Sequence, residues 1–118
     1  MSYEVIRRPG APIEESGYPG FNPRTETVDG LIIDRDVAIP LRDGIIIYAD
    51  IFRPEDKGES DLAVLIGWGP YGKHGAFTYD VFYRNGGVTP DMVSPHCIFE
   101  APDPAFWCPE GYAVVYVD

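Results

Sequence analysis

Two segments of the chain are apolar without any alternation of hydrophobic and polar positions. They are residues 62–68 (LAVLIGW) and residues 113–118 (AVVYVD), the second apolar up to its final aspartate. A strand with one solvent-exposed face carries a polar residue at every second position, so these uninterrupted segments predict strands buried on both faces. Because such strands are typical of parallel sheets, we expect parallel strands here.

A different pattern precedes them, in residues 31–40 (LIIDRDVAIP) and 45–54 (IIIYADIFRP). Both segments are rich in β-branched and aromatic residues, and Asp43 and Gly44 lie in the short connection, which together predict an antiparallel hairpin. The charged positions within these strands include Asp34, Arg35, Asp36 and Asp50. Because charges are tolerated best where a sheet meets solvent, we expect this hairpin near an open edge of the sheet.

The remaining segments predict one helix and two irregular regions. Asp103 and Pro104 are typical of the N-cap and first position of a short helix, which leads into the strand at 113–118. Residues 1–30 are interrupted throughout by proline and glycine, so we expect an irregular N-terminal arm. Residues 69–102 show no clean periodicity, and a connection of that length is usually functional or contains an element that the pattern hides.

Composition narrows the function classes. The 118 residues are enough for one domain, and the net charge of -10, from 19 acidic and 9 basic residues, argues against binding nucleic acid or an anionic membrane surface. Residues 1–20 lack the apolar core of a signal peptide, and the apolar stretches are far shorter than the about 20 residues that span a bilayer. We therefore expect a soluble, cytoplasmic protein.

The metal-binding residue types do not form a recognisable motif. The potential ligands are Cys97, Cys108, His74 and His96, and their spacing matches neither CxxC nor HExxH. In a chain without an export signal, we expect both cysteines to be reduced and to pack as small apolar side chains. We therefore expect neither a metal ion nor a cofactor.

The first apolar strand continues directly into a glycine-rich loop, in the sequence LIGWGPYGKHG of residues 65–75. Glycine permits backbone angles and close approaches that other residues forbid, so such a loop usually brings its backbone near another group. A substrate is one candidate for that group. Tyr71 stands out in this loop, whereas we expect Lys73 to be solvated and Trp68 to pack at the rim of the sheet.

Three segments together resemble the opening of the CocE/NonD family of serine hydrolases, relatives of Xaa-Pro dipeptidyl-peptidases and cocaine esterase. They are residues 37–55 (VAIPLRDGIIIYADIFRPE), 62–75 (LAVLIGWGPYGKHG) and 109–118 (PEGYAVVYVD). The resemblance implies an α/β fold in which residues 31–118 are the N-terminal part of an α/β-hydrolase sheet, an antiparallel hairpin followed by parallel strands. It also implies that Tyr71 donates its hydroxyl to the oxyanion of the tetrahedral intermediate. The family usually has threonine where this chain has Gly69, and this departure leaves the tyrosine in place.

A serine hydrolase also needs a nucleophile in a G-x-S-x-G turn, followed by an acid and a histidine. The serines of this chain are Ser2, Ser16, Ser60 and Ser94, and none lies in such a turn. Ser94 and His96 are close in sequence, but neighbours along a chain rarely form a catalytic pair. We therefore expect a hydrolase domain truncated before its nucleophile, with an incomplete sheet, marginal stability and no activity of its own.

Two functions of different classes remain open. In the first, the chain is a fragment of a serine hydrolase that acts on esters or amides by acyl transfer, and it contributes Tyr71 to the oxyanion hole. In the second, it is a non-catalytic hydrolase-like module that binds a partner, a degenerate gene product, or an unrelated small β-rich domain whose acidic surface serves only solubility. The expected partners are a small ester or peptide-like substrate of the complete protein, and either a complementary C-terminal segment or a second copy of the chain.

Overall fold

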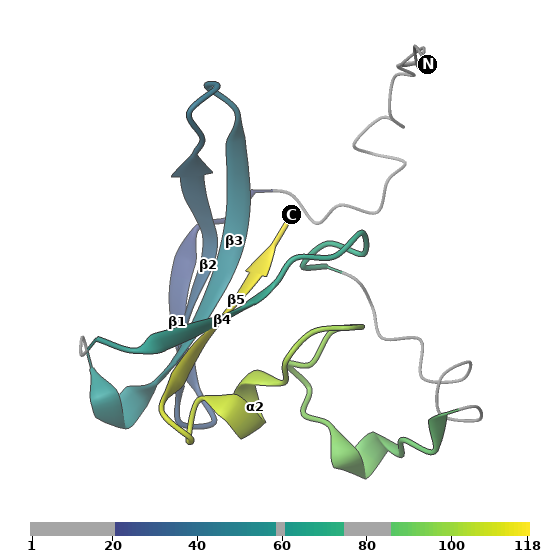
Figure 1. The fold of residues 1–118 in the computed structure, drawn as a ribbon. Helices are drawn as coiled ribbons and strands as arrows, with labels where there is room; N and C mark the ends of the chain where they lie inside the picture. The colour runs from purple at the N-terminus through teal and green to yellow at the C-terminus, as the bar shows by residue number, and fades with distance from the viewer. Residues whose placement is uncertain (1–20, 59–60, 75–85) are drawn as a thin grey trace.

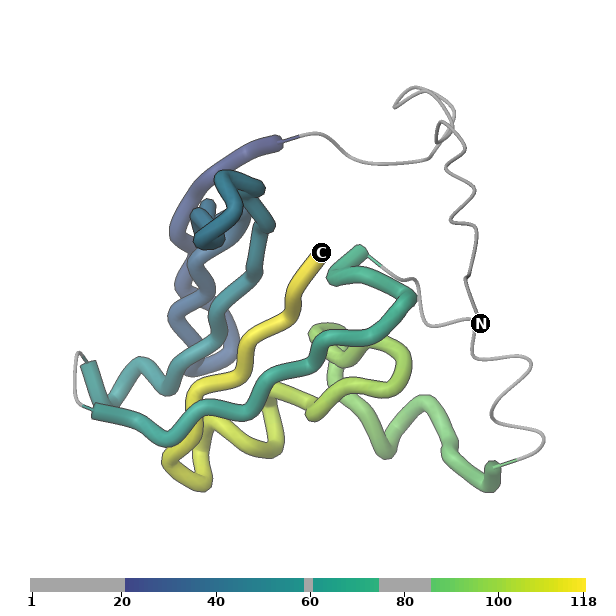
Figure 2. The backbone as a smooth tube through the Cα atoms, turned by 45° about the horizontal axis from the view of Figure 1, so that its top comes forward, coloured from purple at the N-terminus to yellow at the C-terminus, as the bar shows by residue number. Residues whose placement is uncertain are grey.

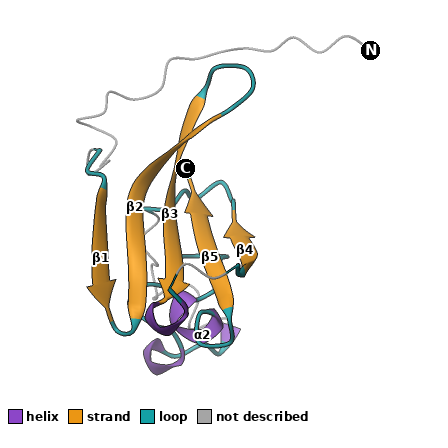
Figure 3. Cartoon of the chain, turned by 90° about the vertical axis from the view of Figure 1, so that its left-hand side faces the viewer, coloured by secondary structure: helices purple, strands orange, loops and turns teal. Residues whose placement is uncertain are grey.

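A computed structural model describes residues 21–58, 61–74 and 86–118. Within these residues, five strands form one mixed sheet in the order β1-β2-β3-β5-β4 (Figures 1 and 3). The strands are β1 (Arg24–Val28), β2 (Leu31–Pro40), β3 (Ile46–Pro54), β4 (Ala63–Gly67) and β5 (Tyr112–Val117). The described helical elements are the α-helix α2 (Pro104–Trp107) and the 3-10 turns η2 (Glu55–Lys57) and η3 (Pro90–Met92). None of the helices in this described part is long and apolar enough to cross a membrane.

The predicted hairpin and the predicted parallel strands are confirmed. β2 and β3 pair antiparallel, and Pro40 lies opposite Ile46 at the turn end of the hairpin. β4 and β5 pair in parallel, with Ala63 opposite Tyr112 and Gly67 opposite Tyr116. The sheet is mixed because β3 pairs antiparallel with β5, so the hairpin joins directly onto the parallel pair.

Two expectations about the N-terminal half were wrong. β2 and β3 each have a strand on both sides, so the hairpin lies inside the sheet and not near its open edge. Its charges are tolerated there because they pair with one another: Arg53 binds Asp34 at 2.8 Å, and Arg35 binds Asp50 at 2.7 Å. Residues 24–28, expected to belong to an irregular arm, form β1, which pairs antiparallel with β2. Residues 1–20 of that arm lie outside the described residues.

The expectation that residues 62–68 are buried on both faces was also wrong. Among the described strands, β4 is outermost, and Val64 and Ile66 are 52% and 61% exposed. Leu65, which points to the opposite face, packs against the core. The apolar pattern predicted the strand, but the burial of its second face depends on a covering layer that no described residue supplies.

The hydrophobic core lies between the sheet and the segment that leads into α2 (Figure 1). It consists of Leu31, Ile33, Phe52, Cys108, Val114 and Tyr116. The expected helix start is confirmed, since the Asp103 side chain accepts a hydrogen bond from the N–H of Ala105. At the end of β4, a Cβ on Gly67 would lie 2.9 Å from the Cβ of Ala101 and 3.2 Å from the Tyr116 ring, so glycine lets this segment pack against the strand.

A β-bulge interrupts β2 between Asp34 and Val37. In a regular strand Asp34 and Asp36 would lie on the same face of the sheet. Asp34 pairs with Ile51, so this face is the one opposite to that of Asp50. The bulge changes this, because Asp36 takes a left-handed conformation, with φ of 54°, and its backbone N–H donates to Asp50. Asp36 therefore joins Asp50 on the same side of the sheet.

Candidate functional site

Tyr71 lies in the loop directly after β4. Because β4 and β5 are parallel, this loop comes to lie beside the C-terminal end of β5 (Figure 2). Ligands of open α/β sheets bind beyond the carboxyl ends of the strands, and Tyr71 is at such a position. The residue is 47% exposed, and its ring packs edge-on against Phe99 with the centroids 4.7 Å apart. The phenol is therefore held on one side and accessible on the other.

The glycine next to Tyr71 has an identifiable role. Gly72 has φ of +64°, and a Cβ at this position would lie 2.6 Å from Oδ1 of Asp118. The next backbone N–H, that of Lys73, donates to the same oxygen at 2.5 Å. The loop thus uses its glycine to approach the carboxylate at the end of β5, which is a partner that the sequence did not indicate.

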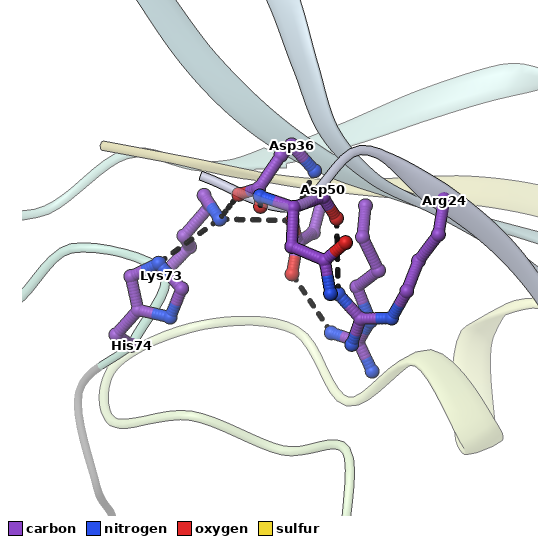
Figure 4. A pocket seen from close by; sticks show the side chains of 7 residues that line it. Arg24, Asp36, Asp50, Lys73 and His74 are labelled. Carbon is purple, nitrogen blue, oxygen red and sulfur yellow. Dashed lines mark hydrogen bonds and ion pairs between the residues drawn. The ribbon is translucent and has the colours of Figure 1, made fainter. Parts of the chain in front are cut away.

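Lys73 is buried, and the expectation that it is solvated was wrong. Its side chain is 1% exposed, and its ammonium group contacts the carboxylates of Asp36 and Asp50 (Figure 4). It also contacts the carboxylate of Asp118. Nζ donates a hydrogen bond to Asp36, lies 3.0 Å from Oδ1 of Asp50 and lies 3.8 Å from Oδ2 of Asp118. We call Lys73, Asp36, Asp50 and Asp118 the lysine cluster.

Further donors satisfy the carboxylates of the lysine cluster. Arg35 Nη1 binds Asp50 at 2.7 Å, and the backbone N–H of Asp36 donates to the other oxygen of Asp50 at 3.0 Å. The backbone N–H of Asn22 donates to Asp36 at 2.7 Å. Buried charges are costly unless they are paired and hydrogen-bonded, and here both conditions are met.

This pairing sets the protonation states. Burial opposes ionisation of Asp36 and Asp50, but hydrogen bonds outweigh it, from Lys73 to Asp36 and from Arg35 to Asp50 above all, and lower the pKa of both carboxyls. Burial likewise opposes the charge on Lys73, but its hydrogen bonds to Asp36 and Asp50 raise its pKa. Lys73 is therefore protonated at neutral pH, which excludes it as a nucleophile or a general base.

A polar pocket of about 250 Å³ opens beside the lysine cluster. It is lined by Asn22, Arg24, Arg35, Asp36, Asp50, Lys73 and His74. The His74 ring places Nε2 3.3 Å from Oδ2 of Asp118 and 3.0 Å from Nζ of Lys73. The charged groups of this pocket bind mainly one another, so the arrangement is suited to holding the loop in place.

Ser94 and His96 do not form a pair of side chains. The Ser94 hydroxyl donates to Asp103 at 2.6 Å and accepts a hydrogen bond from the backbone N–H of His96. The His96 ring instead places Nε2 3.2 Å from Asp29. Ser94 thus belongs to the capping arrangement of α2 and has no base in position to activate it.

The cysteines and the metal-binding residue types give no site. Cys108 is fully buried in the core, and Cys97 is partly buried. Burial raises the pKa of the Cys97 thiol and raises the pKa of Cys108 to about 11, so neither is a thiolate at neutral pH. In residues 21–58, 61–74 and 86–118, no group of three or more His, Cys, Asp and Glu side chains is placed to hold a metal ion.

Sequence reasoning singled out Tyr71 and missed the lysine cluster. The available signal was the presence of Asp36 and Asp50 within strands rich in apolar residues, because a carboxylate that is buried against a sheet needs a cation or a hydrogen-bond donor. Lys73 is separated from Asp36 by 37 positions and from Asp118 by 45 positions. No local pattern reveals a contact over such a separation.

The described residues form a mixed sheet in which an antiparallel hairpin leads into a parallel pair of strands, and they contain few helices. This fold resembles part of a CocE/NonD hydrolase domain. One crystal structure of a CocE/NonD family hydrolase from Staphylococcus aureus superimposes with a TM-score of 0.60 and 31% identity over 74% of this chain. A second structure of that protein gives a TM-score of 0.64 and 26% identity over 93% of this chain.

The chain spans a small part of that hydrolase, 15% of its length in the first structure and 20% in the second. No protein-family model matches the chain, and no curated protein matches it by sequence. The comparisons therefore show a resemblance to part of a CocE/NonD hydrolase domain at the level of the fold.

Proposed function

We propose that this chain is the N-terminal segment of a CocE/NonD-type serine hydrolase, and that Tyr71 donates its hydroxyl to the oxyanion of the tetrahedral intermediate. The observation that carries the proposal is the position of Tyr71, a residue that is 47% exposed and lies beyond the carboxyl end of a parallel strand. The fold resemblance to a CocE/NonD hydrolase supports the same assignment.

The proposed reaction is acyl transfer from an ester or an amide. When a nucleophile attacks the carbonyl carbon, the carbonyl oxygen gains negative charge, and a fixed O–H donor stabilises this charge in the transition state. One such donor is worth about 100-fold to 1,000-fold in kcat. In this proposal, the nucleophilic serine, the acid and the histidine come from the part of the hydrolase domain that this chain does not span.

A second function, the binding of a protein partner, is favoured by one observation. Val64, Ile66 and Trp68 are 52%, 61% and 65% exposed along one face of β4 and the residue that follows it. Parallel strands are normally covered on both faces, so this apolar face is suited to a covering layer. We propose the complementary C-terminal segment of the hydrolase domain as that layer, with a second copy of the chain as the competing occupant.

A chimaeric enzyme tests the catalytic role of Tyr71. This chain replaces the matching segment of the Staphylococcus aureus hydrolase, and the hydrolysis of p-nitrophenyl acetate is followed. We expect Tyr71→Phe to lower kcat about 100-fold or more with little change in KM, because the hydroxyl acts mainly in the transition state. The 118-residue chain alone should give no turnover above buffer.

Tyr112→Phe is the matched control, since Tyr112 lies at the opposite, N-terminal end of β5 and packs against Trp107. It removes a tyrosine hydroxyl away from the proposed site and should leave kcat unchanged. An equal kcat for the Tyr71→Phe chimaera and its parent would remove Tyr71 from the mechanism. Turnover by the chain alone that Ser94→Ala abolishes would show that the chain contains its own nucleophile.

A further inference from the structure

We infer that Lys73 is a positioning residue that holds Tyr71 in place through the lysine cluster, an inference that rests on the proposed function of Tyr71. Lys73 does not itself touch the position where substrate would bind, because its ammonium group is buried among carboxylates. It acts on the backbone of the loop, two residues beyond Tyr71.

The lysine cluster joins four separate parts of the chain. Asp36 belongs to the bulge of β2, Asp50 to β3, Asp118 follows β5, and Lys73 belongs to the loop after β4. A single ammonium group therefore fixes the loop to three strands of the sheet. The side chain of Lys73 binds Asp36, and its backbone N–H donates a hydrogen bond to Asp118. Both the side chain and the backbone of Lys73 are therefore held.

The ring of Tyr71 is restrained by Phe99, whose ring packs against it edge-on. The segment that carries Phe99 is itself tied to the sheet, because the Tyr116 hydroxyl lies within hydrogen-bonding distance of the backbone oxygens of His96 and Pro102, at 3.2 and 2.8 Å. Tyr71 is thus restrained in two ways: the lysine cluster anchors the backbone two residues further along the loop, and the ring packs against Phe99 in a segment that is tied to the sheet.

Such restraint matters for an oxyanion donor. A donor contributes fully only when it is already aimed at the position where charge develops, and supporting contacts must hold it to within about 0.5 Å. Tyr71 is adjacent to Gly72, and glycine by itself restricts the backbone least of all residues. The lysine cluster supplies the restraint that this glycine cannot.

The test measures the environment of Tyr71 in the 118-residue chain and needs no enzymatic activity. Tyrosine and phenylalanine rings are labelled with carbon-13, Tyr71 is assigned with Tyr71→Phe, and the nuclear Overhauser effect between Tyr71 and Phe99 is recorded. In Lys73→Met we expect this signal to be lost and the Tyr71 ring shifts to move toward those of an exposed tyrosine.

The control must separate positioning from a general loss of stability. Ile33→Ala removes a fully buried core side chain and should destabilise the sheet by an amount similar to the loss of Lys73, without touching the loop. We expect its folded molecules to keep the contact between Tyr71 and Phe99. A folded Lys73→Met chain that also keeps this contact would overturn the inference.

If Lys73→Met does not fold, Asp118→Ala tests the positioning role instead. The Asp118 side chain is 26% exposed and follows the last strand, so its removal leaves the core intact while it cuts the bond to the Lys73 N–H. We expect loss of the Tyr71 and Phe99 contact, and its retention would refute the positioning role. These outcomes are independent of the chimaera, in which only the catalytic role of Tyr71 is measured.

Discussion

Replacement of Lys73 by methionine tests the energetic role of the lysine cluster. Methionine keeps an unbranched side chain of similar length but removes the ammonium group. The Asp36 and Asp50 side chains, each 4% exposed, then remain buried with one cation fewer. Arg35 still binds Asp50 at 2.7 Å, whereas Asp36 keeps the hydrogen bond from the Asn22 N–H. Asp36 therefore becomes the poorly compensated charge.

The expected cost follows from that imbalance. Removal of one partner from a buried ion pair typically lowers the free energy of unfolding by about 3–5 kcal/mol, because the remaining charge stays buried. An exposed ion pair contributes about 0–1 kcal/mol, so the two situations are easily distinguished. Since small domains have total stabilities of about 5–15 kcal/mol, Lys73→Met should lose a large part of its free energy of unfolding.

The pH dependence has a definite sign. In the parent chain the pKa values of Asp36 and Asp50 are lowered below 3.8, so their stabilising contribution is present above that pH and is lost as the pH falls through the lowered values. Without Lys73, burial dominates at Asp36 and its pKa rises, so the variant regains stability as that carboxyl takes up a proton. The difference between parent and variant should therefore shrink from pH 7 to pH 4.

Urea unfolding followed by circular dichroism and tryptophan fluorescence measures this difference at both pH values. Lys57→Met is the matched control, because it removes the same charge from an exposed lysine in η2. The reasoning would be refuted if Lys73→Met cost less than about 1 kcal/mol at pH 7, as an exposed pair would. If the free energies of unfolding of the parent and Lys73→Met differ by the same amount at pH 4 and pH 7, the proposed electrostatic origin of the difference is refuted.

Two further predictions concern the loop and the exposed face of β4. Gly72→Ala should lower the free energy of unfolding by about 1.5–3 kcal/mol more than Gly44→Ala, because both glycines have positive φ but only Gly72 closely approaches a carboxylate that accepts a charged hydrogen bond. Equal effects of the two substitutions in urea unfolding would contradict this. Ile66→Asp should change the free energy of unfolding of the monomer by about 0.5 kcal/mol or less, and it should reduce light scattering by associated chains. Leu65→Asp places a charge on the side of β4 that packs against the core, so it should unfold the chain. A loss in Ile66→Asp as large as that in Leu65→Asp would show that the Ile66 face is covered.

The elements with strong local patterns could be predicted from the sequence. The hairpin of β2 and β3 was predicted because its strands are β-branched and aromatic, and β5 because it is continuously apolar. The start of α2 was also predicted, since the Asp103 side chain caps it. β1 was not predicted, because Arg24–Val28 is short, mostly polar and preceded by a proline.

The site could be predicted only in part. Tyr71 was found because a glycine loop follows an apolar strand and resembles a known family, while its catalytic role stays a proposal. The lysine cluster depends on a bulge that moves Asp36 to the face of Asp50, and on the parallel register that brings Asp118 beside Lys73. Both are properties of strand pairing, which a single sequence does not encode in any short window.

Gly67 also limits how β4 can align with its neighbour. A slip of one residue along β5 would place Ile66 or Trp68 at the point where Ala101 and the Tyr116 ring leave no room even for a methyl group. The alignment of most paired strands is set by the burial of their apolar faces. A short strand with one exposed face is held in alignment only weakly by such burial. At the end of β4, the missing side chain therefore acts as a steric stop that selects a single alignment, and the direction in which the Tyr71 loop leaves the sheet follows from it.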